Sequence, residues 1–571
     1  MFVHFGLYSS FGGRYARKEI SGFGEWIQRR AQIPISVYEA FGKENFRPTP
    51  DFAKNLVREA KAAGVRYIVM TSKHHDGFGL FKSDADSYNT YEFFGRDLCR
   101  ELADACHEAG LELGFYYSHA LDWHERNGGG NHTLSHPNEK ILNRNFWDYP
   151  DDNIDFAEYF RRKCLPQVRE LLTNYGDLKC IWFDYPHDIT YEQSFELRNL
   201  VKEIQPNCLI NSRIGYNLCD YYSLGDNYLP YAPACVPTEC LITLNDSWGY
   251  KMDDLNYKSS EQVADILCRA ISSDATLLMN VGPMGDGSLT PETLKILSDI
   301  SEWTKRNSEA IYGNISANPF KSVFTWGYVS RGEKSLYLYV KDCEDTLSLS
   351  GINSTPLSVS LIGDSRRVEY SFENGVLTVK IVEIDMFFPI YRVDFAVSPS
   401  ISSELEIDSA RGSLLAAYAT VGSRADSSKC ASIPHKYNIE SGELGISEIS
   451  VNRIDAVNRW ESSDDVLTWD VSFLESGEYS AEIVAAEPSF ETTCSSPSDD
   501  APCTLSVGDA SNSGLNGVKP TARLAKKGRS VRDGGRFRIE KAGKYRVALA
   551  KDNDALGLGV LEVRFTKEKK L

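Results

Sequence analysis

The sequence predicts an α/β architecture, a (β/α)8-like barrel over residues 1–313, followed by two β-sandwiches over 314–398 and 399–571. Up to Asn314, apolar strand-like runs alternate with amphipathic helical stretches. Beyond it, apolar residues recur at every second position, which is typical of antiparallel strands. A chain of 571 residues is also too long for one hydrophobic core, so several domains are expected.

The barrel follows from a repeated strand and helix cycle. In the first full cycle Thr49-Pro50 begins a helix, Phe52, Leu56 and Ala60 share its apolar face, and Gly64 ends it. No glycine-rich dinucleotide turn follows the opening strand, which favours a barrel over a doubly wound sheet. Further strands are expected at 65–71, 113–117, 180–184, 208–211 and 276–281, with helices at 98–109, 154–175, 192–204 and 292–307.

The second half of the chain predicts two β-sandwiches. Ser335–Val340 alternates polar and apolar residues, and Asn374-Gly375 between two such runs is a strong hairpin signal. In the third segment we expect two similar hairpins, one through Gly477 and one through Gly543, with a loop at 492–502. Such a sandwich could be a carbohydrate-binding module or a packing module without a ligand.

Composition narrows the possible partners. A net charge of −18 argues against a nucleic-acid partner, and no apolar stretch reaches the roughly 20 residues of a membrane span. Thirteen cysteines without a CxxC pair indicate neither a disulfide framework nor a zinc site. No signal peptide precedes the first strand, so we expect a cytoplasmic protein, or a periplasmic or secreted one if this N-terminus is truncated. The oligomeric state is not predicted.

Polar and aromatic residues follow successive predicted strands. In a barrel they would converge at the C-terminal end. Three chemistries are open: glycoside hydrolysis by Asp184 and Glu239, metal-assisted hydrolysis, and sugar binding without catalysis. The metal ligands would be His4, His74, His75 and Asp184. Tryptophans favour a sugar, because aromatic faces pack against its C–H patches. They are Trp26, Trp123, Trp182 and Trp248.

A set of short motifs resembles the α-L-fucosidases of glycoside hydrolase family 29 over about residues 1–312. They occur in the family's order, and together they are highly specific. The motifs are Val3-His4-Phe5-Gly6, Glu25-Trp26, Lys73-His74-His75-Asp76-Gly77-Phe78, Tyr116-Tyr117-Ser118, Trp182-Phe183-Asp184, Asn211-Ser212-Arg213, Asp246-Ser247-Trp248-Gly249 and Asn280-Val281-Gly282-Pro283.

The resemblance implies a retaining exo-glycosidase that removes terminal α-L-fucose from glycans, with Asp184 as nucleophile and without a metal or cofactor. Glu239 would be the acid/base, because its nine-residue offset from Trp248 resembles one subgroup of the family; Asp246 is the fallback, although it also fits a turn. There are two alternatives: a fucose- or glycan-binding protein without activity, and a glycosidase for a related sugar such as an α-L-galactoside. The expected substrate-binding residues are His4, Glu25, Trp26, His74, His75, Tyr117, Trp182, Arg213 and Trp248.

Overall fold

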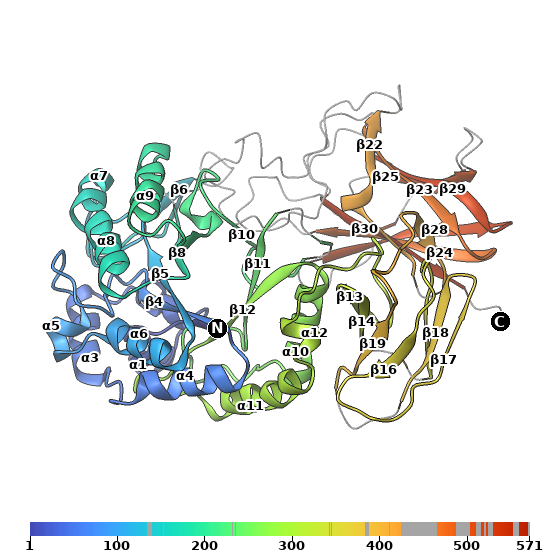
Figure 1. Cartoon of the computed structure of the whole chain (residues 1–571). Helices are drawn as coiled ribbons and strands as arrows, with labels where there is room; N and C mark the ends of the chain where they lie inside the picture. Colours follow the sequence, from blue (N-terminus) through green and yellow to red (C-terminus); the bar gives the residue numbers. More distant parts are fainter. Residues whose placement is uncertain are drawn as a thin grey trace.

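The computed structural model describes most of the chain. It leaves out residues 134–139, 152, 187, 231, 234–235, 342, 344, 383–386, 410, 424–464, 487–502, 510–515, 519–520, 523–528, 552–558 and 569–571. The predicted loop at 492–502 therefore lies outside the described residues. The barrel is on the left of Figure 1 and the two sandwich regions are on the right.

Eight parallel strands form the barrel sheet, in the order β10-β11-β12-β1-β4-β5-β8-β9. A parallel bridge between Asn211 and Tyr221 joins the neighbourhoods of β9 and β10 and brings the two edges of the sheet together. This confirms the predicted (β/α)8-like barrel. The strands are β1 (Phe2–Val3), β4 (Tyr67–Lys73), β5 (Glu112–Ser118), β8 (Cys180–Asp184), β9 (Leu209–Ile210), β10 (Tyr222–Ser223), β11 (Thr238–Thr243) and β12 (Ala275–Val281).

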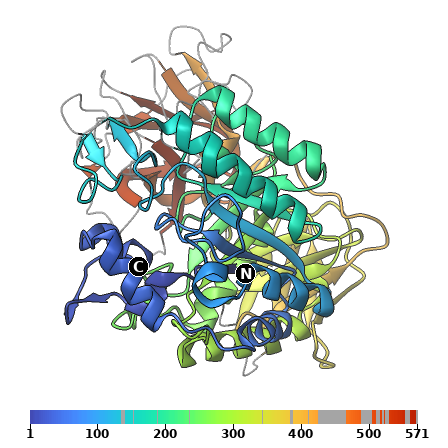
Figure 2. The same ribbon diagram turned by 90° about the vertical axis from the view of Figure 1, so that its left-hand side faces the viewer.

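Amphipathic helices cover the outside of the sheet. Helix α4 buries Phe52, Leu56 and Ala60 as the sequence predicts, and the Asp97 side chain caps α6 by accepting from the backbone N–H of Arg100. The helices α8 and α9 pack side by side (Figure 2). The barrel helices are α4 (Phe52–Ala62), α6 (Leu98–Ala109), α7 (Phe156–Tyr159), α8 (Leu165–Asn174), α9 (Tyr191–Ile204), α10 (Ser260–Ser272) and α11 (Pro291–Arg306). The other helices are shorter or lie in loops: α1 (Leu7–Phe11), α2 (Ile27–Arg30), α3 (Ile35–Asn45), α5 (Thr90–Phe94) and α12 (Glu309–Tyr312).

The predicted helix 154–175 is interrupted. A π-helical turn, Phe160–Cys164, separates α7 from α8. Pro166 lies in the first turn of α8, where its missing N–H removes a regular i→i−4 hydrogen bond. The turn places Lys163 inward, with its side chain fully buried.

The first sandwich has the expected hairpin. Strands β17 (Tyr370–Glu373) and β18 (Val376–Lys380) pair antiparallel, and Asn374 and Gly375 both have positive φ between them, as a tight turn requires. Its two sheets share one apolar core that includes Leu338 and Val393. The other strands are β13 (Gly327–Arg331), β14 (Ser335–Val340), β15 (Thr346–Leu349), β16 (Ser358–Leu361) and β19 (Ile390–Asp394).

The second sandwich corrects a predicted pairing. Strand β23 pairs with β29, and β24 pairs with β28 and β30, so neither predicted hairpin forms. The segments through Gly477 and Gly543 instead carry the chain from one sheet to the other. The strands with their bounds are β20 (Leu405–Ile407), β21 (Ser413–Leu415), β22 (Thr420–Ser423), β23 (Asp465–Phe473), β24 (Gly477–Ala486), β25 (Cys503–Asp509), β26 (Asn516–Val518), β28 (Arg529–Ile539), β29 (Gly543–Lys551) and β30 (Gly559–Lys567).

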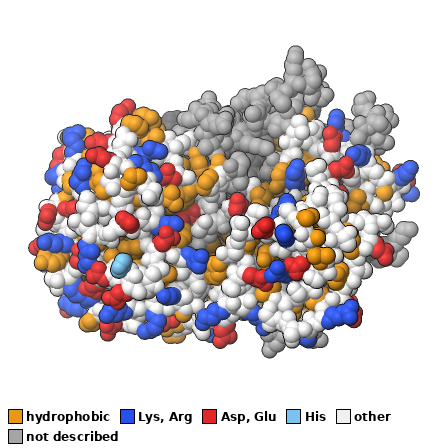
Figure 3. All heavy atoms as spheres, viewed as in Figure 1, with side chains coloured by type: hydrophobic (Ala, Val, Ile, Leu, Met, Phe, Trp, Pro, Cys, Tyr) orange, Lys and Arg blue, Asp and Glu red, His pale blue; other side chains and the backbone are white. Residues whose placement is uncertain are grey.

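The second sandwich also contacts the barrel. Ala232, in the segment between β10 and β11, forms a small buried apolar cluster with Leu415 and Val484 of the sandwich. The exact domain limits at 313/314 and 398/399 stay predictions. In the part of the chain that the structure describes, no helix is long and apolar enough to cross a bilayer. On the face seen in Figure 3, acidic and basic side chains are interspersed.

Candidate active site

Asp184 lies at the C-terminal end of β8, as predicted. Its Oδ1 accepts a hydrogen bond from Arg213 Nη1 at 3.0 Å, and its Oδ2 accepts from the Tyr116 hydroxyl at 2.8 Å. The side chain keeps 15% of its surface exposed. Burial raises the pKa of Asp184, but the charge of Arg213 and the hydrogen bonds outweigh it and hold the pKa below the ordinary value of 3.8. The carboxylate is therefore ionised and partly accessible, which a nucleophile requires.

Arg213 joins Asp184 to a second carboxylate that the sequence analysis did not select. Arg213 Nη2 donates to Asp226 Oδ1 at 2.5 Å, and 44% of the Asp226 side chain is exposed. Asp226 follows the short strand β10, and the next residue, Asn227, anchors it by accepting hydrogen bonds from the backbone N–H and hydroxyl of Thr243. One guanidinium thus holds two carboxylates at the same end of the barrel.

The histidines His4 and His75 are neutral and have defined tautomers. His4 Nδ1 donates to Asn280 Oδ1 at 2.7 Å, because the amide nitrogen of Asn280 donates elsewhere. His75 Nδ1 donates to the Ser118 hydroxyl at 2.7 Å, since that hydroxyl donates to a backbone carbonyl. Burial lowers the pKa of His4 to about 4 and that of His75 to about 3. Each ring therefore offers its Nε2 lone pair to a hydroxyl donor.

Glu25 and His74 carry buried polar atoms that have no hydrogen-bond partner among the described residues. These atoms are Glu25 Oε1 and His74 Nδ1. Glu25 Oε2 accepts from the backbone N–H of Gly249 at 2.7 Å. Burial raises the pKa of Glu25 to about 7. Because unpaired buried polar atoms are costly, their presence next to the other histidines is consistent with a hydroxylated ligand that pairs with them.

Two predicted tryptophans border this cluster. The Trp26 ring centroid lies 5.3 Å from that of His75, and Trp248 lies 5.2 Å from His4. Trp26 is partly exposed and Trp248 is buried. The structure therefore brings together His4, Glu25, Trp26, His74, His75, Arg213 and Trp248 with Asp184.

Tyr117 corrects a prediction, because it lies on the opposite face of β5 from Tyr116. Its hydroxyl donates to Gln167 Oε1 on α8 at 2.8 Å, outside the barrel. The neighbouring Tyr116 points into the barrel and reaches Asp184. Successive side chains of a strand alternate between faces, so a shift of one residue exchanges the two roles. Trp182 also lies inside the barrel, 1% exposed beneath Arg213, whose Cζ is 4.9 Å from the indole centroid.

Glu239 is the second correction, because it lies near the N-terminal end of the barrel. It is the second residue of β11 and only 2% exposed. A cavity of about 510 Å³ reaches it from that end, lined by residues that begin strands, among them Tyr67, Cys180 and Thr276. Burial raises its pKa to about 7. The fallback, Asp246, is an exposed turn residue that accepts from the Asn256 side chain at 2.9 Å.

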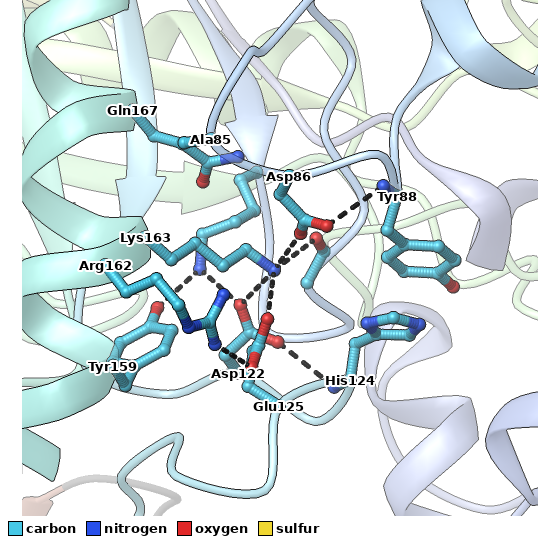
Figure 4. A network of polar contacts seen from close by, with 12 residues as sticks. Ala85, Asp86, Tyr88, Asp122, His124, Glu125, Tyr159, Arg162, Lys163 and Gln167 are labelled. Carbon is cyan, nitrogen blue, oxygen red and sulfur yellow. Dashed lines mark hydrogen bonds and ion pairs between the residues drawn. The ribbon is translucent and has the colours of Figure 1, made fainter.

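The described residues do not support the metal alternative at His4, His74, His75 and Asp184. The only group of potential ligands that comes together among them is Asp86, His124 and Glu125, with ligand atoms within 4.8 Å of one another. Lys163 already pairs with Asp86 at 2.5 Å, and Arg162 pairs with Glu125 at 2.5 Å (Figure 4). These cations compensate the negative charge that would attract a metal ion.

Four further residues of this site are not among the predicted ones: Tyr116, Ser118, Asp226 and Asn280. Three of them lie within or beside motifs already noted, so strand alternation could have identified Tyr116 and Asn280. Asp226 follows Tyr222–Ser223, a strand of two residues that is too short for periodicity to detect. The polar turn Gly225-Asp226-Asn227 after an aromatic pair was the available signal.

Comparison with known proteins identifies the family of the barrel region. The family model Alpha-L-fucosidase matches residues 1–309. Alpha-L-fucosidase 1 of Arabidopsis thaliana is 27% identical over 334 residues, 52% of this chain and 58% of that relative, so the chain spans a little over half of its length. A solved α-L-fucosidase from Vibrio sp. strain EJY3 is 23% identical with a TM-score of 0.79, covers 100% of this chain and 96% of its own, and shows the fold alone.

An α-L-fucosidase from Lactobacillus casei, solved in complex with α-L-fucose product, is 38% identical with a TM-score of 0.51 and covers 54% of this chain and 95% of its own. A variant of that enzyme has been solved in complex with Fucα(1,6)GlcNAc. The family match, over residues 1–309, extends over more than half of this chain. The chain belongs to the α-L-fucosidase family.

Proposed function

We propose that this protein is a retaining exo-α-L-fucosidase that hydrolyses terminal α-L-fucosides of glycans. The observation that carries the mechanism is the pair of carboxylates, Asp184 and Asp226, held by the single guanidinium of Arg213. Family membership supports the sugar, and the Fucα(1,6)GlcNAc bound to the Lactobacillus casei relative supports a glycan substrate.

In this mechanism Asp184 attacks the anomeric carbon while Asp226, in its protonated form, transfers its proton to the departing glycosidic oxygen. A covalent fucosyl ester forms, and the leaving sugar departs as an alcohol. Asp226 then removes a proton from water, which attacks the ester and releases fucose with retained configuration. Asp226 suits the acid/base role because its exposed side chain lies where a leaving group can reach it.

The neutral histidines and Glu25 bind the fucose hydroxyls. His4 and His75 accept through Nε2, and the unpaired Oε1 of Glu25 forms a hydrogen bond with a further hydroxyl. A sugar with a missing or inverted hydroxyl leaves such buried groups unpaired, which is the basis of discrimination. The partly exposed Trp26 supplies an apolar face for the ring.

The first test is turnover of an aryl α-L-fucoside and release of L-fucose from α-1,2, α-1,3, α-1,4 and α-1,6 linked glycans. Asp184→Ala should lower kcat by roughly a thousandfold or more, because the ester cannot form. Asp246→Ala, which changes an exposed turn carboxylate, is the matched control and should keep wild-type kcat. Fucose release by Asp184→Ala at the wild-type rate would refute the mechanism, and no release by the wild type would refute the function.

The second test concerns Asp226. Asp226→Ala should slow substrates with poor leaving groups far more than those with activated aryl groups, because only the former need a proton. Azide should restore turnover of the activated substrate and give α-L-fucosyl azide, the product of attack on the covalent intermediate. Product analysis by NMR distinguishes the anomers, and a variant with neither leaving-group dependence nor azide rescue would remove Asp226 from the acid/base role.

A further inference from the structure

Glu239 is a buried carboxyl that the proposed mechanism does not use. Its Oε1 accepts a hydrogen bond from Trp182 Nε1 at 2.8 Å, and its Oε2 is 3.0 Å from the Tyr67 hydroxyl. No lysine or arginine forms an ion pair with it among the described residues. A buried acid without an ion-pair partner is costly; its two hydrogen bonds are the largest interactions that compensate its burial, followed by the charges of the Met1 amino group and Arg213.

Trp182 links Glu239 to the proposed nucleophile. Its indole stacks on the ring of Tyr116 with a centroid distance of 5.6 Å and an interplanar angle of 17°. The guanidinium of Arg213 lies over the same indole, with its Cζ 4.9 Å from the ring centroid. Tyr116 donates a hydrogen bond to Asp184 Oδ2, and Arg213 donates one to Asp184 Oδ1. The orientation of a single ring therefore affects both donors.

The two ends of the barrel are connected through this ring. Glu239 is the second residue of β11 and lines the cavity at the N-terminal end, whereas Asp184 ends β8 at the C-terminal end. Trp182 lies between them, two residues before Asp184, and its N–H points toward Glu239 while its face carries Arg213. Glu239 is thus separated from the substrate by the side chain that it binds.

We propose that Glu239 is a positioning residue: it fixes the indole of Trp182, and through Trp182 it holds Tyr116 and Arg213 in place on Asp184. This inference rests on the proposed function. A fixed ring keeps the donors of the nucleophile preorganised, and small displacements of such groups lower the rate strongly.

Two variants of similar size separate this role from the others. In Glu239→Gln, the amide oxygen accepts from Trp182 and the amide nitrogen donates to the Tyr67 hydroxyl, so the indole keeps its partner. In Glu239→Leu, the indole N–H is left without an acceptor. We expect Glu239→Leu to lower kcat/KM by about tenfold to a hundredfold, and Glu239→Gln to restore most of that loss.

The leaving group distinguishes positioning from acid catalysis. Glu239→Leu should slow aryl fucosides with good and poor leaving groups by the same factor, and azide should not restore the rate. Asp226→Ala, measured beside it, should show the opposite behaviour on both counts. If Glu239→Leu and Glu239→Gln both show leaving-group dependence and azide rescue, Glu239 is the acid/base and the inference is wrong.

Trp182→Phe tests the link directly, because it removes the indole N–H but keeps an aromatic ring. Its effect on kcat/KM should not add to that of Glu239→Leu in the double variant, since both substitutions remove the same hydrogen bond, the one from Trp182 to Glu239. Additive effects, or a Glu239→Leu enzyme with wild-type kcat/KM, would overturn the proposal. If Glu239→Leu does not fold, as judged by circular dichroism, the comparison of Trp182→Phe with Glu239→Gln decides: equal losses in both contradict the inference. An inactive wild type would instead refute the proposed function.

Discussion

At the scale of single residues, the ionisation of Asp184 depends on a few donors. Arg213 and Tyr116 each donate to one of its oxygens, and together they outweigh the burial that would raise its pKa. His75 Nε2 lies 3.7 Å from Oδ2 but is neutral at ordinary pH, because burial lowers the pKa of His75 to about 3. The acidic limb of activity should therefore respond to the two donors rather than to this histidine.

We predict that Tyr116→Phe shifts the acidic limb of kcat/KM to higher pH by about one unit. The variant removes a hydrogen bond to the charged form of Asp184, so its pKa rises and a higher pH is needed to ionise it. The pH dependence of aryl fucoside hydrolysis measures this shift. Tyr117→Phe is the matched control, since that hydroxyl binds Gln167 outside the barrel; a shift in the control equal to that of Tyr116→Phe would contradict the assignment.

The same residues indicate what the sequence could predict. The apolar run before Asp184 and the turn after Asn211 were sufficient to place Asp184 and Arg213 at one end of the barrel. The prediction of Tyr117 as a substrate-binding residue is wrong by one position, because two adjacent tyrosines give no alternation of polarity that would show which one faces the barrel interior. The prediction of Glu239 as the acid/base depends on a resemblance in sequence spacing. Its position along the barrel axis depends instead on where β11 begins.

At the scale of elements, the π-helical turn before α8 supports the loop that carries His74 and His75. Lys163, inside that turn, pairs with Asp86 at 2.5 Å and Asp122 at 3.0 Å. Lys73, at the end of β4, pairs with the same Asp122 at 3.0 Å (Figure 4 shows the surrounding network). Burial lowers the pKa of Lys163, but the carboxylates outweigh this and hold it above its ordinary value. This cluster ties β4, α8 and the loop after β5 together.

Removing Lys163 should therefore destabilise the protein. Lys163→Met leaves buried carboxylates with one cation fewer, which typically costs about 3–5 kcal/mol. Lys295→Met is the matched control, because Lys295 pairs with Asp299 on the exposed side of α11 and such pairs contribute about 0–1 kcal/mol. Urea unfolding measures both changes, and equal losses of unfolding free energy would contradict the role of the cluster.

Two features at this scale were not predicted: the strand β10 and the strand pairing of the second sandwich. Strand β10 has two residues and gives no periodic signal. The segments through Gly477 and Gly543 look like hairpin turns, but strand alternation does not encode which strand is the partner, and each segment crosses between sheets. The Asn374-Gly375 hairpin was predicted correctly because its turn geometry is local.

At the scale of the whole molecule, buried carboxyls should make stability depend on pH. Burial raises the pKa of Glu25, Asp76 and Glu239 to about 7 each. Between their unfolded values, about 4, and 7 each of these carboxyls binds more of its proton in the folded protein than in the unfolded chain, so the stabilisation that it contributes at low pH is lost as pH rises. The buried histidines His4 and His75, whose pKa is lowered, contribute the opposite dependence, so the effect of one carboxyl is measured as a difference between two proteins.

We predict that Glu239→Gln removes one contribution that falls with pH, so that between pH 5 and pH 8 the melting temperature of the variant rises relative to that of the wild type. Differential scanning calorimetry across this range measures both. Asp286→Asn, at an exposed turn, is the control and should leave the slope unchanged. A difference between the two melting temperatures that stays constant over this interval, or that changes in the opposite direction, would contradict the protonated state of Glu239.

The contact of Ala232 with Leu415 and Val484 has a consequence for how this chain can be divided. Ala232 belongs to the same connection between β10 and β11 that carries Asp226, so the loop with the proposed acid/base rests partly on the last sandwich. Shortening or exchanging the C-terminal region in an engineered version would therefore alter the supports of a reacting group.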